Sequence, residues 1–381
     1  MNISLKEHRI RFSCLAALLL VALLGLAACS GPGGSNGVPP PPGAGGLKAF
    51  VVNRGSSNVS VINRSTNAVT ATIAVGSNPT DAVLLPDGSK LYVANATSDN
   101  VSVIDPATDT VLATIAVGTR PVALAASPDG TRVFVVNRDS DTVSIINTTT
   151  DAVIATPTVG NEPRALAVLP DGSKVYVANF TSNNVSVIST ASNTVTTTIS
   201  VGLRPLGLAA TPDSAKVYVA NNNSNNVTLI ATSSDTVSAT IPLPGATGPQ
   251  AVGITPDGTR AYVLNDTTPN VSVILVASDA VTATITLAGS PRAVAFTPDS
   301  ATALVALPLN DLVARIDVAS NSQNVTVVVG DEPVFVVVNS AGDTAFVANR
   351  ASNTVSVVDI LTASVSATVA VGTSPVVVVL E

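Results

Sequence analysis

Residues 121–159 read PVALAASPDGTRVFVVNRDSDTVSIINTTTDAVIATPTV, and this stretch decides the fold. It holds four short segments rich in Val, Ile and Ala, separated by turn signals such as Pro-Asp-Gly at 128–130. Segments of this length, bounded by Gly, Pro, Asn and Asp, are typical of β-strands joined by tight turns. The unit therefore predicts four antiparallel strands.

The same unit recurs along the chain. Its clearest marker is VGxxP, whose glycines at 76, 118, 160 and 202 are each 42 residues apart. A fixed period of this size indicates a repeat architecture, and four strands per repeat, arranged radially, describe an all-β propeller. Helical and leucine-rich repeats are disfavoured because the helix-period apolar pattern is missing. A β-helix is the remaining alternative, although its coils are usually shorter.

The number of blades follows from the second strand of each unit. Its motif (FVVN, YVAN, YVLN or FVAN) occurs seven times, and a degenerate copy, ALVALP at 303–308, fills the remaining gap. We predict eight blades if the degenerate copy forms a blade and seven if it does not. The chain enters the repeat at a second strand near residue 49 and ends with a first strand at 374–381. Pairing these two strands would close the ring and remove two exposed sheet edges.

These units resemble those of the YVTN-repeat β-propeller family. The resemblance is carried by YVANATSDNVSVIDPATDTVLATIAVGTRP at 92–121 and YVANFTSNNVSVI at 176–188, and it covers essentially all of residues 47–381. It implies a propeller fold and a surface or envelope location, and it rarely implies enzymatic activity. The architecture is also similar to that of propeller lactonases, but a shared fold does not transfer an activity.

Residues 1–28 have the form of an export signal. A basic start is followed by an apolar run from 12 to 28, and Cys29 comes directly after Leu-Ala-Ala, which resembles the lipobox of bacterial lipoproteins. The resemblance implies cleavage before Cys29 and lipidation of that residue; a simple secretory peptide and an uncleaved anchor are the alternatives. Residues 29–46 would then be the lipidated cysteine and a Gly/Pro-rich linker, and 47–381 the propeller. We expect an exported protein anchored to the cell envelope. The outer membrane is favoured because Ser30 follows the cysteine. The sequence does not distinguish between the periplasmic and the surface side of that membrane.

Composition limits the chemistry of the mature chain. Its tryptophan count is zero, and its histidine, its methionine and one of its two cysteines fall in the signal, at His8, Met1 and Cys14. Without imidazole or a spare thiolate, the propeller lacks a histidine base and the usual ligands for zinc or haem, so we expect no metal or cofactor. The formal charge of −7 argues against nucleic acid as a partner.

Two sets of loops carry the candidate site. The VGxxP link and the residues after the second-strand asparagine should surround one mouth of the central channel, while the lysines that follow the PDG turns should lie on the opposite face. The ligand-binding candidates on the mouth loops are Arg54, Arg120, Arg138, Arg164, Arg204, Arg292, Arg350, Glu162 and Glu332. Arginine binds carboxylate or phosphate groups bidentately. The alternative is that these are solvated loop charges paired with neighbouring acids, which include Asp81 and Asp331.

Other repeated residues have structural interpretations. We expect the second-strand aromatic residues to pack between blades rather than to form a stacking surface. The asparagines of that motif are interpreted as turn caps. Irregular stretches at 243–250, 304–317 and 339–343 depart from the repeat and are either drift or functional variation.

The sequence therefore predicts a non-enzymatic binding scaffold, monomeric and in contact with the membrane only through its lipid. Its partner would be a protein, a glycan or a small anionic ligand bound at the loop face, and no catalytic residue is assigned. The alternative is a lactonase-like hydrolase that uses Glu162, Glu332 and Asp331 with the mouth arginines, and with a divalent ion held by oxygen ligands.

Overall fold

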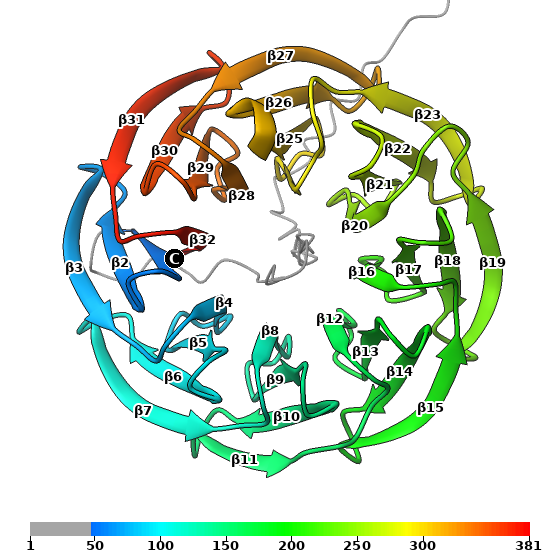
Figure 1. Cartoon of the computed structure of the whole chain (residues 1–381), viewed down its shortest axis with the longest axis horizontal. Helices are drawn as coiled ribbons and strands as arrows, with labels where there is room; N and C mark the ends of the chain where they lie inside the picture. The colour runs from blue at the N-terminus through cyan, green and yellow to red at the C-terminus, as the bar shows by residue number, and fades with distance from the viewer. Residues whose placement is uncertain (1–46) are drawn as a thin grey trace, which may run out of the picture.

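The computed structural model describes residues 47–381 and shows a closed ring of eight four-stranded antiparallel sheets. In Figure 1 the first strand of each sheet lines the centre and the fourth lies on the outer rim. The prediction of an eight-bladed propeller is confirmed. The predicted signal, the linker and Cys29 lie outside the described residues. No helix in residues 47–381 has the length and apolar character needed to cross a membrane.

We number the blades along the chain and give their strands from the channel outward. Blade 1 contains β32 (Pro375–Leu380), β1 (Lys48–Asn53), β2 (Asn58–Asn63) and β3 (Ala68–Ala74). Blade 2 contains β4 (Pro79–Leu84), β5 (Leu91–Asn95), β6 (Asn100–Asp105) and β7 (Thr110–Ala116). Blade 3 contains β8 (Pro121–Ala126), β9 (Arg132–Asn137), β10 (Thr142–Asn147) and β11 (Ala152–Ala155). Blade 4 contains β12 (Pro163–Val168), β13 (Lys174–Asn179), β14 (Asn184–Ser189) and β15 (Thr194–Ser200).

The second half of the ring repeats this order. Blade 5 contains β16 (Pro205–Ala210), β17 (Lys216–Asn221), β18 (Asn226–Ala231) and β19 (Thr236–Pro242). Blade 6 contains β20 (Pro249–Ile254), β21 (Arg260–Asn265), β22 (Asn270–Leu275) and β23 (Ala280–Thr286). Blade 7 contains β24 (Ala293–Phe296), β25 (Thr302–Leu307), β26 (Leu312–Asp317) and β27 (Ser322–Val328). Blade 8 contains β28 (Pro333–Val338), β29 (Thr344–Asn349), β30 (Thr354–Asp359) and β31 (Ser364–Ala370).

Blade 1 closes the ring. Strand β32 pairs with β1 in an antiparallel register that sets Phe50 opposite Val379, as the order of the repeats predicted. The degenerate copy is also a complete blade, because β25 keeps its pairing with β24 and β26. A single 3-10 turn, Pro308–Asn310, replaces the polar loop there.

The second-strand aromatic residues fill the spaces between blades. All seven are essentially inaccessible to solvent, and Tyr92 of blade 2 packs with Leu124 and Val133 of blade 3. Their predicted role in inter-blade packing is confirmed. Large buried rings contribute about 1.5–3 kcal/mol each to folding.

The VGxxP glycine and the second-strand asparagine form one packing unit. Asn95 is fully buried, and its amide donates to Asn100 Oδ1 at 2.8 Å and to Ser102 Oγ at 3.0 Å, so it bridges two strands as well as the turn between them. Gly76 lies so close to this side chain that a Cβ on the glycine would be 2.7 Å from Asn95 Cβ. The two most regular motifs of the sequence therefore hold the mouth loops in place.

On the opposite face, lysines and tyrosines clamp neighbouring blades together. Asp279 of blade 6 accepts hydrogen bonds from Tyr218 Oη at 2.7 Å and from Lys216 Nζ at 2.7 Å, both on blade 5. The same arrangement joins Lys90 and Tyr92 to Asp151, and Lys174 and Tyr176 to Asp235. The predicted position of these lysines, away from the arginines, is confirmed.

Candidate anion-binding site

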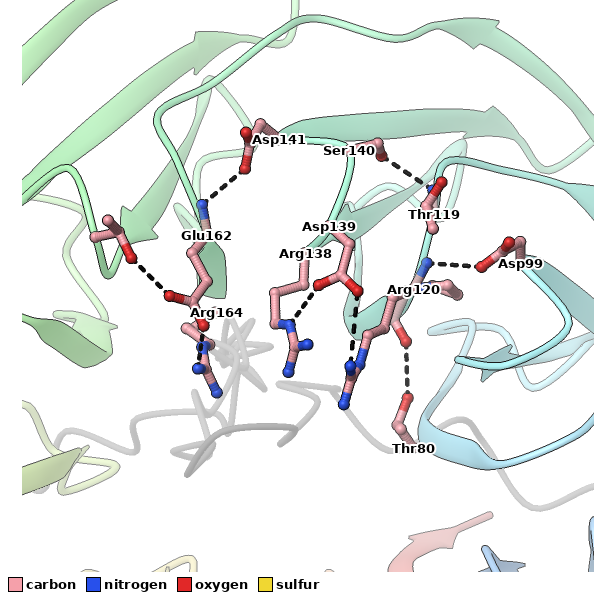
Figure 2. Close-up of polar contacts among 12 residues, drawn as sticks. Thr80, Asp99, Thr119, Arg120, Arg138, Asp139, Ser140, Asp141, Glu162 and Arg164 are labelled. Carbon is pink, nitrogen blue, oxygen red and sulfur yellow. Dashed lines mark hydrogen bonds and ion pairs between the residues drawn. The ribbon is translucent and has the colours of Figure 1, made fainter.

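The two sets of loops meet on one face, as expected. The residue after the second-strand asparagine donates its backbone N–H to the VGxxP link that leads from the preceding blade into its own, for example from Arg138 N to Arg120 O at 3.0 Å and from Arg350 N to Glu332 O at 2.9 Å. The mouth loops are therefore bonded to one another from blade to blade around the channel. Figure 2 shows this contact zone in blades 2 to 4.

Arginines gather around one cavity in the mouth of the channel. The cavity has a volume of about 220 Å³, and six of the seven predicted arginines line it: Arg54, Arg120, Arg138, Arg164, Arg292 and Arg350. They occupy three positions of the repeat: after the second-strand asparagine, just before the loop proline and just after it. They belong to blades 1, 3, 4, 7 and 8 and the links into them. The seventh, Arg204, does not line the cavity and lies beside Phe180 instead.

Four charged residues of the VGxxP loops occupy a left-handed backbone conformation. They are Arg120, Glu162, Arg204 and Glu332, with φ between 55° and 57°. This region suits glycine or asparagine and costs other residues about 1 kcal/mol or more. An acceptor from the preceding blade holds each one in place, as when Asp99 Oδ1 accepts the N–H of Arg120 at 2.7 Å (Figure 2). Asn78 and Ser374 hold the same conformation at this position in other mouth loops, so the loop geometry, not the charge, requires it.

Carboxylates neutralise four of the arginines. Asp139 pairs with Arg138 at 2.7 Å and with Arg120 at 3.6 Å, and the hydrogen bond from Arg138 holds the pKa of Asp139 below its usual range. Figure 2 shows these side chains extending in the same direction from their loops.

The two candidate glutamates are also paired. Glu162 pairs with Arg164 and accepts from Thr181 Oγ1 at 2.6 Å, and that hydroxyl and then Arg164 lower its pKa. Glu332 pairs with Arg350, whose Nε donates at 2.9 Å. Such half-exposed pairs add little stability, so their main effect is to fix where the guanidinium groups lie.

The other three of the seven candidate arginines have no ion-pair partner among residues 47–381. Arg54 Nε donates to Asn78 Oδ1 at 2.5 Å, and Arg292 donates to Gln250 Oε1 at 3.1 Å. Arg204 makes only a cation–π contact with Phe180. Protein atoms around the Arg292 guanidinium, and then the nearby charge of Arg350, lower the pKa of Arg292. Part of the Arg292 side chain is still open to solvent, and an anion bound there would offset both the loss of water around the guanidinium and the repulsion from Arg350.

Phe180 is the functional residue that the sequence did not reveal. Its ring lies between two arginines, 4.9 Å from Arg164 Cζ and 5.3 Å from Arg204 Cζ. A cation–π contact orients a guanidinium without cancelling its charge. The available signal was that Phe180 occupies the position held by arginine in blades 1, 3 and 8.

Asp81 was wrongly placed among the mouth acids. It lies within β4, is fully buried, and accepts the N–H of Leu124 on blade 3 at 2.8 Å. Burial raises the pKa of Asp81 well above its usual range. The strand begins at the loop proline, so this residue is already inside the sheet and joins two blades.

The carboxylates do not converge in the way that the hydrolase alternative requires. Glu162 and Glu332 lead into blades 4 and 8, which stand on opposite sides of the eight-membered ring. Across the described propeller, His, Cys, Asp and Glu side chains form no group of three that could hold a metal ion. The mouth is organised around arginine.

Comparison with protein families matches this chain to one of them. The YNCE-like β-propeller family matches residues 9–132 and 118–230, which together span more than half of the chain. Comparison with curated proteins finds no match.

Solved structures share the fold at low identity. Dihydro-heme d1 dehydrogenase NirN in complex with DHE aligns with a TM-score of 0.76 and 18% identity, over 90% of this chain and 77% of that one. AztD from Citrobacter koseri, in its apo form, aligns with a TM-score of 0.70 and 13% identity, over 88% of this chain and 97% of that one. Hydrazine synthase from Kuenenia stuttgartiensis aligns with a TM-score of 0.60 and 19% identity, over 90% and 99%. At these identities the similarity establishes the fold alone.

Proposed function

The chain belongs to the YNCE-like β-propeller family, and from that premise we propose that it is a non-enzymatic propeller that binds an anionic ligand at its arginine-lined mouth. The observation that carries the proposal is the single cavity lined by six arginines, of which Arg54 and Arg292 have no carboxylate partner in the described propeller.

The mouth arginines carry positive charge that is not fully neutralised, and their loops hold them in a fixed geometry. Guanidinium groups that are close together and not neutralised repel one another, so an anion that bridges them relieves this repulsion and gains charge-assisted hydrogen bonds. The loops already hold these side chains in place, which lowers the entropy lost on binding. Carboxylates and phosphates fit the planar fork of arginine best.

We also propose that the propeller is exported and tethered to the cell envelope through lipid on Cys29, which lies outside the described residues. The support is the basic start, the apolar run and the Leu-Ala-Ala-Cys sequence. Replacing the cysteine (Cys29→Ser) should release the protein from the membrane fraction of the native host. Retention of that variant in the membrane would contradict a lipid anchor.

Anion binding can be tested by calorimetric titration of the full-length protein with inorganic phosphate. Arg54→Gln and Arg292→Gln each remove a mouth charge without stranding a carboxylate. Each should weaken binding by roughly tenfold or more, because a hydrogen bond to a charged group contributes about 1.5–3 kcal/mol.

The matched control is Arg260→Gln, which removes the same charge at the start of β21 on the opposite face. This control should bind phosphate as the wild type does. If all three variants lose affinity equally, binding reflects overall charge, and the mouth is not the site.

A further inference from the structure

We propose that the ligand of this mouth is an organic anion with an apolar body, rather than an inorganic anion or a sugar phosphate. This rests on the proposed function and names the class of ligand. The juxtaposition that supports it is an arginine rim directly above an apolar wall, both lining the same cavity.

The wall is formed by the first strands of neighbouring blades. The residue directly after each loop proline faces the channel, and in blades 8, 1 and 3 it is Val334, Val376 and Val122, all half-exposed. Rim arginines come from the mouth loops of the same blades, at Arg350, Arg54 and Arg138. Each of these blades therefore supplies an apolar surface with a cation beside it.

Blade 8 carries most of this surface. In β28, Val334 and Phe335 are both half-exposed and both line the cavity, whereas in β8 only Val122 is half-exposed. Phe335 occupies a position that is alanine or glycine in five other blades. It lines the cavity while also packing against the core of blades 1 and 2.

An inorganic anion would contact the arginine rim but leave the apolar wall exposed to water. The apolar wall contributes to affinity only when a ligand covers it and displaces water. A sugar phosphate would bury hydroxyl groups against Val and Phe side chains that can accept no hydrogen bond. A carboxylate on a short alkyl or aromatic body satisfies both surfaces at once.

The cavity has room for such a body. Its volume is about 220 Å³ and it opens to solvent. A short alkyl carboxylate such as hexanoate, with about eight non-hydrogen atoms, is small enough to place its carboxylate at the rim and its chain along the wall.

The experiment is a chain-length series. Acetate, butyrate, hexanoate and inorganic phosphate are titrated by calorimetry into the full-length protein at constant pH and ionic strength. Full burial of each methylene would tighten binding about fourfold, from about 0.8 kcal/mol per CH₂. We expect hexanoate to bind at least tenfold more tightly than acetate, and also more tightly than phosphate.

A polar substitution in the wall provides the structural check. Val334→Thr keeps the shape and has a natural counterpart, since Thr80 occupies the same position in blade 2. This substitution should reduce the ratio of hexanoate affinity to acetate affinity severalfold and leave the affinity for acetate unchanged. The control is Leu206→Thr, at the same position in blade 5 but outside the cavity lining, which should leave the whole series unchanged.

The outcomes separate this inference from the function on which it rests. If acetate and hexanoate bind equally, or phosphate binds best, the mouth is an anion site and the apolar ligand is wrong. If none of the four anions binds, both proposals are wrong. A chain-length effect that Val334→Thr leaves intact would place the alkyl chain elsewhere and would also overturn the inference.

Discussion

Removing one hydroxyl group from an inter-blade clamp should destabilise the propeller measurably. In Tyr218→Phe the buried ring stays, and only the 2.7 Å hydrogen bond to Asp279 of the next blade is lost. Burial and then the hydrogen bond to Asp279 raise the pKa of Tyr218, so the hydroxyl is protonated and acts as a donor at any physiological pH.

The magnitude follows from the charge on the acceptor. A hydrogen bond to an ionised group contributes about 1.5–3 kcal/mol. Since Lys216 Nζ still contacts both carboxylate oxygens, at 2.7 and 2.8 Å, Asp279 does not become an unpaired charge. We therefore expect a loss at the lower end, about 1.5–2 kcal/mol.

Blade 6 offers a matched control. Tyr262 occupies the same position, but its hydroxyl lies 3.5 Å from the neutral side chain of Asn321. A contact this long contributes little, so Tyr262→Phe should cost about 0.5 kcal/mol or less.

The assay is urea unfolding followed by far-UV circular dichroism, because the chain has no tryptophan to report by fluorescence. The two substitutions should differ by about 1 kcal/mol or more in the free energy of unfolding. Equal losses in both variants would refute the assignment of the Tyr–Asp–Lys arrangement as a clamp.

Three further outcomes are expected. Asp81→Asn removes the cost of burying a charge but has one oxygen for the two N–H groups, of Leu124 and Ala82, that donate to the carboxylate; the variant's own stability should not depend on this titration. Because the pKa of Asp81 is raised in the fold, the wild type loses stability as pH rises above about 4. The melting temperature of this variant relative to wild type should therefore increase from pH 4 to pH 8, and a pH-independent difference would contradict this. Gly202→Ala places a Cβ 2.7 Å from Asn221 and should cost about 1–3 kcal/mol in urea unfolding, whereas an unchanged midpoint would show that the loop yields freely. Phe180→Leu should weaken phosphate binding about two- to fivefold through lost cation–π contacts with little change in melting temperature; unchanged affinity would mean that the ring does not position the arginines.

The fold could be predicted because the residues that recur in each repeat have strict backbone and packing requirements. The glycine of VGxxP and the second-strand asparagine touch in blade after blade, so a larger residue at the glycine would clash with the asparagine side chain. Ring closure followed from the order of strands, since the chain starts at a second strand and ends at a first. The blade that lost the motif still forms because β25 keeps a continuous apolar run that is buried on both faces of the sheet.

The site was predictable only in outline. The position of each arginine on a mouth loop follows from the repeat, but pairing depends on which side chains meet across blades. Asp139 takes two arginines, one from its own loop and one from the VGxxP link that leads into its blade, a contact that spacing does not specify. Asp81 was misplaced because side chains alternate along β4. Thr80, directly after the proline, faces the mouth, whereas Asp81, one residue further along, faces the neighbouring blade.

The central claim is that the mouth arginines form an anion site, and the most direct measurement is a crystal of the propeller soaked in bromide and examined by anomalous scattering. We predict that the strongest bromide peak lies inside the cavity, within contact distance of Arg54 or Arg292. Bromide spread over the outer loops, with none among the mouth arginines, would contradict it.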